Sequence, residues 1–193
     1  MKHNDKFQLR YASGDADNRF AIDFFVWNGK LLINDRALQA EPSPLAAITR
    51  LSCVYGQIHE KPCVLHVVDT EPSDGLKHSF LDYRALTASG GSTKWCAANH
   101  ALQIGNWLSK QRFCGNCGGS LHLSNEELRL DCSDCNRMTY PASTPVCIAV
   151  VVRGQELLLG RSAHFATGVY SALAGYLQPG ENAEQCIRRE INE

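Results

Sequence analysis

The sequence lacks the features that mark several large classes of protein. No apolar run approaches the ~18 residues that span a membrane, and the opening MKHNDKFQLRY has no apolar core of a signal peptide. Neither sign of charge dominates, because 19 Lys and Arg face 20 Asp and Glu. This balance does not favour a protein that coats polyphosphate or a membrane surface. We therefore expect a soluble cytoplasmic protein with no membrane partner.

The chain has nine cysteines, an odd number, so thiols or metal ligands are expected rather than a disulfide framework. Four of them form two C-x2-C pairs, Cys114 with Cys117 and Cys132 with Cys135, separated by fourteen residues. Each pair makes a tight turn, called a knuckle below, and a hairpin brings two knuckles together. The spacing predicts a zinc ribbon with structural Zn²⁺, since four cysteines leave no open coordination position.

Other residues near and beyond the ribbon have simpler interpretations. Gly115 and Gly118 suit the sharp turns of the first knuckle. The remaining cysteines have no metal-site spacing and are interpreted as small apolar residues in apolar surroundings: Cys53, Cys63, Cys96, Cys147 and Cys186.

The first ninety residues predict mostly strand. Asn28-Gly29 lies between two apolar runs, which is a strong hairpin signal. Residues 49–69 predict a second strand pair with its turn at 59–62, and residues 70–79 predict a polar loop.

Residues 92–110 repeat apolar side chains at intervals of three and four, which predicts an amphipathic helix that connects two parts of the chain. His59, His66 and His78 have no carboxylate or cysteine partner in the sequence pattern. We interpret them as ordinary strand or surface residues.

Beyond the ribbon the pattern returns to strands. Residues 146–152 are continuously apolar and predict a strand buried on both faces. Residues 156–159 predict the return strand, and residues 170–174 a third short strand.

The chain closes on GYLQPGENAEQCIRREINE, which predicts a helix from residue 183. Asn182 suits the N-cap, with Gln185 in capping-box position. Glu190 and Glu193 then share a helix face about 5 to 6 Å apart at Cβ. Two such carboxylates repel unless a divalent cation neutralises them, and their hard oxygens suit Mg²⁺ or Mn²⁺.

The whole pattern resembles the Nudix box as far as the sequence extends. Its six matching positions would coincide by chance on the order of once in a million windows: Gly175, Glu181, Arg189, Glu190, Ile191 and Glu193.

The order of the segments resembles the NADH pyrophosphatases of the NudC type. This resemblance implies an α+β protein, with a β-rich N-terminal domain at 1–90, a connecting helix at 91–112, a Cys₄ zinc ribbon at 113–141, and the first part of a Nudix α/β/α sandwich at 142–193. It implies hydrolysis of NAD(H) or a related dinucleotide to nicotinamide mononucleotide and AMP, removal of NAD caps from RNA, and a homodimer when full length.

The resemblance also implies roles for residues at matching positions. Glu190 and Glu193 would bind catalytic Mg²⁺ or Mn²⁺, and Glu181 and Arg189 would support and orient the box helix. Gly175 is the motif glycine.

Two tyrosines have roles by the same resemblance. Tyr176 stands where the family has an aromatic ring against the nicotinamide, and Tyr140 resembles a second ring that lines the pocket. Core packing is the alternative role for both tyrosines.

Three departures from the family pattern stand out. Ala142 replaces a usual arginine, and Gln178 replaces a frequent acid. The third is at the end, because the family has a further glutamate after Glu193 and then more strands. We therefore expect that the coding sequence continues with glutamate, and that these 193 residues alone are inactive.

Two other functions stay open. One is a zinc-ribbon module that binds RNA, attached to a non-catalytic Nudix remnant; Lys110, Arg112 and Arg137 would permit it. Four acidic residues in the ribbon argue against this basic footprint: Glu126, Glu127, Asp131 and Asp134. The other is a Nudix hydrolase of a different nucleoside diphosphate derivative.

Overall fold

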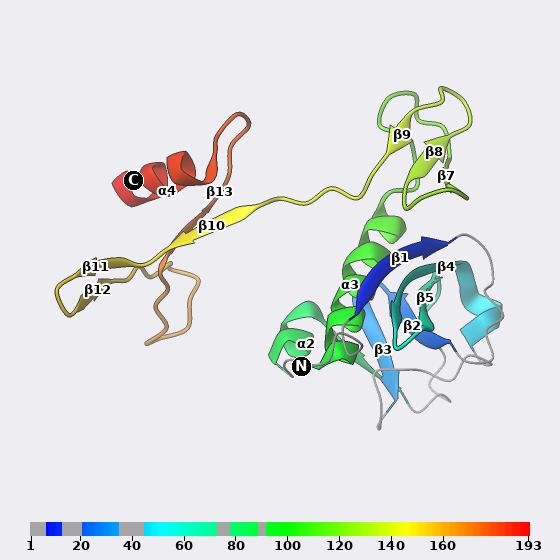
Figure 1. The fold of residues 1–193 in the computed structure, drawn as a ribbon, viewed down its shortest axis with the longest axis horizontal. Coiled ribbons are helices and arrows are strands. Elements are labelled where there is room, and N and C mark those ends of the chain that lie inside the picture. Colours follow the sequence, from blue (N-terminus) through cyan, green and yellow to red (C-terminus); the bar gives the residue numbers. More distant parts are fainter. Residues whose placement is uncertain (1–6, 13–20, 35–44, 73–77, 89–91) are drawn as a thin grey trace. The chain divides into compact units, whose positions relative to one another are not determined.

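The computed structural model describes residues 7–12, 21–34, 45–72, 78–88 and 92–193. The chain divides into two compact units, unit 1 at Met1–Pro141 and unit 2 at Ala142–Glu193. Strands and helices are mixed in both, which confirms the predicted α+β class (Figure 1). No helix in the described part of the chain is long and apolar enough to cross a membrane.

Unit 1 is built on a six-stranded sheet in the order β1-β4-β5-β2-β3-β6. The strands are β1 Gln8–Ala12, β2 Ile22–Trp27, β3 Lys30–Asn34, β4 Thr49–Ile58, β5 Lys61–Val68 and β6 His78–Leu81. A 3-10 turn, η3 Ala46–Ile48, precedes β4. Neighbouring strands are antiparallel, except that β2 and β5 run parallel.

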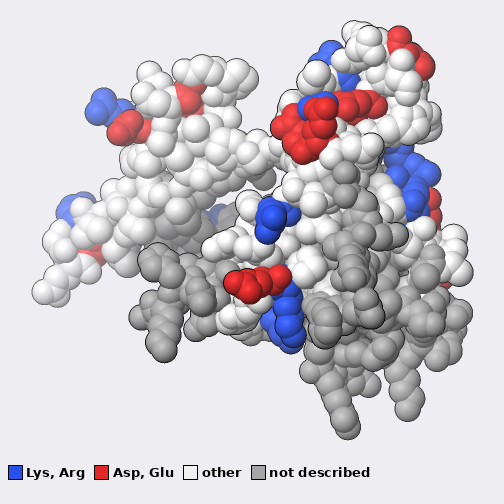
Figure 2. All heavy atoms as spheres, turned by 45° about the vertical axis from the view of Figure 1, so that its right-hand side comes forward, with Lys and Arg blue, Asp and Glu red and all other residues white. Residues whose placement is uncertain are grey.

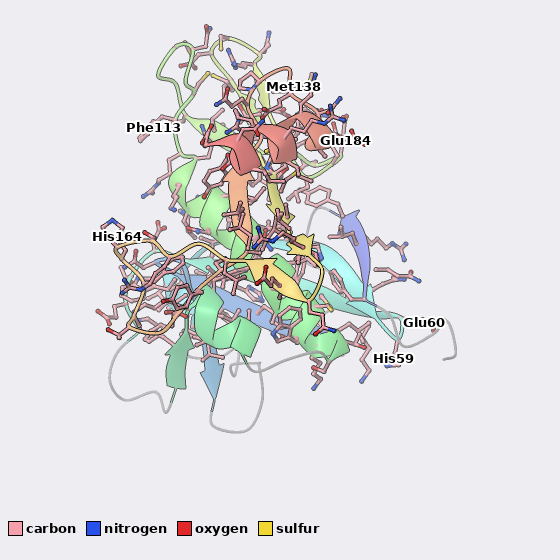
Figure 3. The ribbon with its side chains drawn as sticks, turned by 90° about the vertical axis from the view of Figure 1, so that its left-hand side faces the viewer. His59, Glu60, Phe113, Met138, His164 and Glu184 are labelled. Carbon is pink, nitrogen blue, oxygen red and sulfur yellow. The ribbon has the colours of Figure 1, made fainter. Side chains whose placement is uncertain are left out.

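The two predicted hairpins are confirmed. Asn28 and Gly29 join β2 to β3 with φ of 46° and 72°, the left-handed values that such a turn requires. His59 and Glu60 join β4 to β5 with φ of 47° and 65°, and Figure 3 shows both at the tip of that hairpin. Of the predicted polar loop, residues 73–77 lie outside the described residues, and its last two residues already belong to β6.

The helix predicted at 92–110 is present as α3, Thr93–Lys110, with the Ser92 side chain accepting the Trp95 N–H at 3.2 Å. It packs along one face of the sheet (Figure 1). Gly105 permits this close approach, because a Cβ there would collide with Val26 of β2. Besides connecting, α3 therefore completes the main core of unit 1. A shorter helix, α2 Tyr83–Ala88, precedes it and has no counterpart among the predictions.

The ribbon at the end of unit 1 holds three short strands in the order β7-β8-β9. They are β7 Leu121–Leu123, β8 Leu130–Cys132 and β9 Met138–Thr139. The strands are antiparallel, so the first knuckle before β7 and the second knuckle after β8 lie at the same end of the hairpin.

Unit 2 consists of two strand pairs and one helix. In the first pair β10, Val146–Ala149, runs antiparallel to β13, Leu173–Tyr176; in the second β11, Val151–Arg153, pairs with β12, Glu156–Leu158. The helix α4, Ala183–Asn192, packs against β13 and β10.

The prediction of one strand buried on both faces at 146–152 is wrong. The run divides between β10 and β11, and along β10 exposed Val146 and Ile148 alternate with half-buried Cys147 and Ala149. The physical reason is that α4 covers a single face of a two-stranded sheet. The third predicted strand begins later than expected, at Leu173, with Ser171 making an isolated bridge to Gly160.

Candidate functional site

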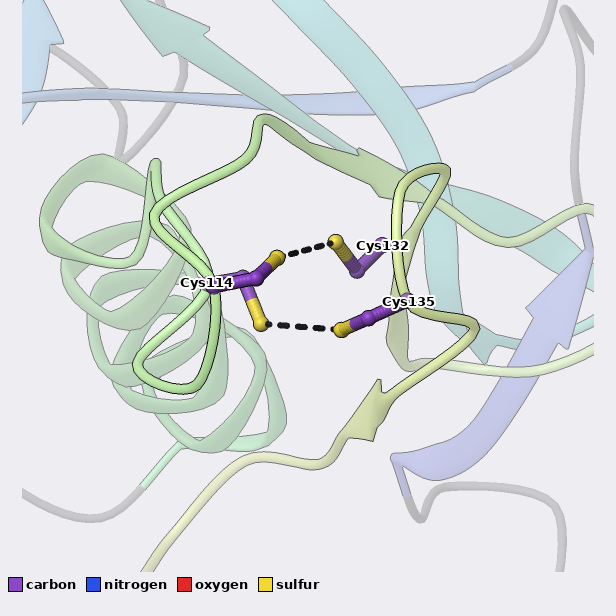
Figure 4. A group of neighbouring side chains, drawn as sticks. Cys114, Cys132 and Cys135 are labelled. Atoms are coloured by element: carbon purple, nitrogen blue, oxygen red, sulfur yellow. Dashed lines mark hydrogen bonds between the residues drawn. The ribbon is translucent and has the colours of Figure 1, made fainter.

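The four predicted zinc ligands converge in the structure (Figure 4). The Sγ atoms of Cys114 and Cys135 are 3.6 Å apart, and those of Cys117 and Cys132 are 3.4 Å apart. All four sulfurs lie within 4.8 Å of one another. Zn–S bonds of about 2.3 Å in a tetrahedron place sulfurs roughly 3.8 Å apart, so the cluster has nearly the size that a zinc ion requires.

The backbone of the first knuckle supports a thiolate. The N–H groups of Asn116 and Cys117 point at Cys114 and lower the pKa of its thiol to about 6. Gly118 has a φ of 78° and Asn136, at the equivalent place in the second knuckle, has a φ of 56°. Gly115 does not adopt a positive φ, so the predicted need for glycine holds at Gly118 and not at Gly115.

The five remaining cysteines do not share one environment. Cys53, Cys63 and Cys186 are buried, as predicted. Cys96 is exposed and Cys147 is half-buried, which corrects the expectation that both lie in apolar surroundings. Cys96 lies in the first turn of α3 and is not among the buried residues of that helix.

The second candidate site lies on α4 and is organised by Arg189. Its Nε and Nη2 donate to the two carboxylate oxygens of Glu181 at 2.9 and 3.0 Å, and Nη2 also donates to the Tyr176 carbonyl at 2.9 Å. Its Nη1 donates to Glu190 at 2.6 Å and to Glu193 at 3.1 Å. One guanidinium thus fixes the loop before the helix and touches both carboxylates of the helix face.

The helix begins as predicted. Asn182 accepts the Gln185 N–H at 2.9 Å, and the Gln185 side chain accepts the Asn182 N–H at 2.9 Å, which completes a capping box. Glu181 lies just before this cap, and Arg189 lies two turns into α4. The ion pair between them therefore connects the loop before the helix to the second half of the helix.

The charges around Arg189 do not balance. Three carboxylates, from Glu181, Glu190 and Glu193, surround one guanidinium. The hydrogen bonds from Arg189 and from the Gln178 N–H lower the pKa of Glu181 to about 2, and the same carboxylates raise the pKa of Arg189. Two negative charges remain in excess, which one divalent cation would neutralise.

Gly175 makes room for the carboxylate of Glu190. A Cβ at this position would overlap the carboxylate of Glu190, whose side chain is 19% exposed and lies against the strand. The oxygen donors of Glu190 and Glu193 fit Mg²⁺ or Mn²⁺ in kind. In the described part of the chain, however, the four cysteines are the single group of three or more potential ligands close enough to hold a metal ion.

The two predicted substrate rings lie in different units. Tyr176 is 64% exposed and follows Gly175 in β13, so it projects from the sheet face opposite to α4. Tyr140 belongs to unit 1, is 51% exposed, and donates its hydroxyl to Glu127 at 2.8 Å. Neither ring is packed in a core.

One polar network of unit 1 was missed by the sequence analysis. His66 Nε2 lies 2.8 Å from a carboxylate oxygen of Asp23, and Ser52 Oγ lies 2.7 Å from His66 Nδ1. The three residues come from β4, β5 and β2, and Phe25 stacks on the imidazole. His66 lies in a strand, as interpreted, and the pairing of strands far apart in the sequence gives it a carboxylate partner that the sequence pattern does not show.

Residues 143–193 match the family model described as the NUDIX domain. This segment is therefore similar in sequence to Nudix domains. The chain is 51% identical over 94 residues to the NAD-capped RNA hydrolase NudC of Stutzerimonas stutzeri, which covers 49% of this chain and 34% of that protein.

Two further relatives have the same name. The NudC of Pseudomonas fluorescens is 44% identical over 110 residues, 57% of this chain and 40% of that protein. The NudC of Pseudomonas aeruginosa is 42% identical over 123 residues, 64% of this chain and 44% of that protein. The matched part of the chain thus spans less than half the length of these curated relatives. Residues 143–193 are called the Nudix segment below.

Proposed function

We propose that this chain supplies the Nudix segment of a metal-dependent pyrophosphohydrolase that acts on NAD-capped RNA and on NAD(H), and that releases nicotinamide mononucleotide. The observation that supports it most directly is the arrangement around Arg189, where Glu190 and Glu193 share a helix face with an excess of negative charge. The names of the relatives, NAD-capped RNA hydrolases, support the capped-RNA substrate.

Each residue of the candidate site has a separate proposed role. Glu181 and the Tyr176 carbonyl hold Arg189, and Arg189 holds the turn before α4 and the helix in register. Glu190 and Glu193 would hold Mg²⁺ or Mn²⁺, which supplies neutralisation of the diphosphate and a lowered pKa of the attacking water. The exposed ring of Tyr176 offers a stacking surface for the nicotinamide, worth about 1 to 3 kcal/mol per base.

The ribbon would bind one structural Zn²⁺ and would take no part in the chemistry, since all four ligand positions are cysteine. An RNA-binding role for the ribbon has less support. Arg129 is bonded to Glu126, Glu127 and Asp131 at 3.3, 2.5 and 2.8 Å, and Figure 2 shows acidic side chains gathered among the basic ones. These contacts neutralise Arg129 and so do not create a basic surface that would bind phosphates.

We further propose that the 193 residues alone do not turn over substrate, that the protein acts in the cytoplasm, and that a longer form is a homodimer. The inactivity follows from the metal ligands, because two carboxylates near the end of α4, one of them 61% exposed, hold a divalent cation weakly.

The substrate proposal is tested with a fusion protein, in which residues 1–193 are joined to the residues that follow the corresponding position in the Stutzerimonas stutzeri relative. With Mn²⁺, the fusion protein should convert NAD-capped RNA to 5′-monophosphate RNA and nicotinamide mononucleotide, and should leave 5′-triphosphate RNA intact. The unfused chain is the matched control and should convert neither. Equal cleavage of both RNAs would favour a different nucleoside diphosphate substrate.

A further inference from the structure

The helix α4 approaches the sheet of unit 2 closely at one place. Gly175 has no side chain to hold the helix away, and a Cβ there would overlap Glu190. The Cys186 side chain fills the space beside it, with its Sγ 3.7 Å from the Gly175 carbonyl and 3.6 Å from the Tyr176 carbonyl. Cys186 is completely buried. Its thiol therefore lies directly against the strand pair.

Cys147 faces the same helix from the neighbouring strand. It is the direct register partner of Gly175, and paired residues of antiparallel strands project from the same face of a sheet. Because a Cβ on Gly175 would point at α4, the Cys147 side chain projects towards α4 as well. The exposure pattern of β10 agrees, since Val146 and Ile148 on the other face are exposed and Cys147 is half-buried.

Cys147 and Cys186 therefore lie on the facing sides of β10 and α4. Burial raises the pKa of Cys186, and the charges of the neighbouring Cys147 and Glu181 raise it further. A disulfide requires Cβ atoms about 3.5 to 4.5 Å apart, a separation that residues in facing contact across a close helix–strand approach can reach.

We propose that Cys147 and Cys186 form an oxidation site, in which a peroxide converts the two thiols to a disulfide that joins β10 to α4. Cys147, the more exposed sulfur, takes one oxygen from hydrogen peroxide to become a sulfenic acid, and the other oxygen leaves as water. The Cys186 thiol then attacks that sulfur, the S–S bond forms and a second water leaves. Two thiols lose two hydrogens, and one peroxide is reduced to two waters.

Competing thiols are few in the described residues. Four cysteines belong to the ribbon cluster, and Cys53 and Cys63 are buried in unit 1 with thiol pKa values raised to about 12 by burial. Cys96 is exposed and is the natural reference for oxidation without a partner. The bridge would hold the first half of α4 on the sheet and slow its local opening.

The test uses the zinc-loaded chain treated with hydrogen peroxide and blocked with N-ethylmaleimide. Cleavage after arginine places Cys147 in peptide 138–153 and Cys186 in peptide 162–188, each with a single cysteine. Mass spectrometry should find these two peptides joined, lighter by two hydrogens than their sum, and amide exchange in α4 should be slower in the oxidised protein. Cys96→Ser should leave the bridge in place, and Cys147→Ser should abolish it.

Either of two results overturns the proposal. One is the absence of the joined peptide under conditions that oxidise Cys96. The other is a Cys186 that becomes linked to a different cysteine. Cys147→Ser replaces a half-buried residue, so its folding is expected to be normal even if Cys186→Ser does not fold. Failure of this proposal leaves the hydrolase proposal untouched, because no substrate enters the measurement.

Discussion

At the scale of single residues, Gly175 is the position where the structure allows the least change. Gly175→Ala places a methyl group in the space of the Glu190 carboxylate, so that carboxylate must turn away and give up its hydrogen bond with Arg189. We expect a destabilisation of about 1 to 3 kcal/mol, which is typical of overpacking. Hydrogen exchange of the α4 amides measures it, with Ala174→Ser on the opposite, exposed face as the matched control. Unchanged exchange in Gly175→Ala would contradict the close approach.

A second prediction concerns Glu181 and the dependence of the stability of α4 on pH. Its pKa is lowered in the fold to about 2, chiefly by its hydrogen bonds with Arg189. A lowered carboxylate pKa contributes stability above the unfolded value of about 4.3, and that contribution is lost as the pH falls towards 2.

The measurement is helix content and amide exchange of α4 between pH 7 and pH 2. Protection should decrease below about pH 4.3 in the wild-type chain. Glu181→Gln should show weaker protection at pH 7 and a flatter profile, since the bidentate pair is absent. A profile of Glu181→Gln that matches the wild type would show that the pair does not hold the helix.

At the scale of elements, we expect the two knuckles to depend on a bound metal ion for their fold. Cys132→Ser removes one of four ligands and should release Zn²⁺, unfold the ribbon, and leave the sheet of unit 1 folded on α3. Metal analysis after dialysis should find about one zinc per wild-type chain, as a closed four-cysteine site implies. Cys96→Ser, on an exposed cysteine outside the cluster, should retain the metal. Equal zinc content in both variants would refute the site.

Local elements and hairpins were predictable, and the pairing of strands far apart in the sequence was not. The knuckles, the capping box at Asn182 and the turn at Asn28-Gly29 depend on residues a few positions apart, so the sequence pattern is enough. The parallel contact of β2 with β5 and the network of His66 depend on strands far apart in the sequence. Periodicity carries no information on such pairing.

The candidate sites follow the same division. The ligand set of the ribbon and the residues around Arg189 were found from spacing and from resemblance to the Nudix box. The placement of Cys147 and Cys186 on facing sides of β10 and α4 was not, because it requires the register of β10 with β13 and the position of α4 together. The exposure of one face of β10 was not predicted for a related reason. An apolar run does not reveal which elements cover the strand.

At the scale of the whole molecule, two chemically separate parts are joined in one chain. Unit 1 contains the thiol cluster, and unit 2 contains the carboxylates of the Nudix segment. We therefore predict that loss of zinc and loss of the box carboxylates have different consequences. The first should unfold the ribbon, and the second should leave the fold intact and stop the chemistry.

The central claim is that the carboxylate of Glu190 carries the metal-dependent hydrolysis. Its most direct test is kcat/KM for NAD-capped RNA with Mn²⁺, measured on the fusion protein with Glu190→Gln and with Glu184→Gln. Glu184 lies exposed in the first turn of the same helix, as Figure 3 shows, and serves as the matched control. Glu190→Gln should reduce kcat/KM by roughly 10²- to 10³-fold, because a metal ligand is worth several kcal/mol in the transition state. Glu184→Gln should reduce it less than about twofold, since surface changes are nearly neutral. Equal activities of the two variants, in proteins with normal zinc content, would contradict the account.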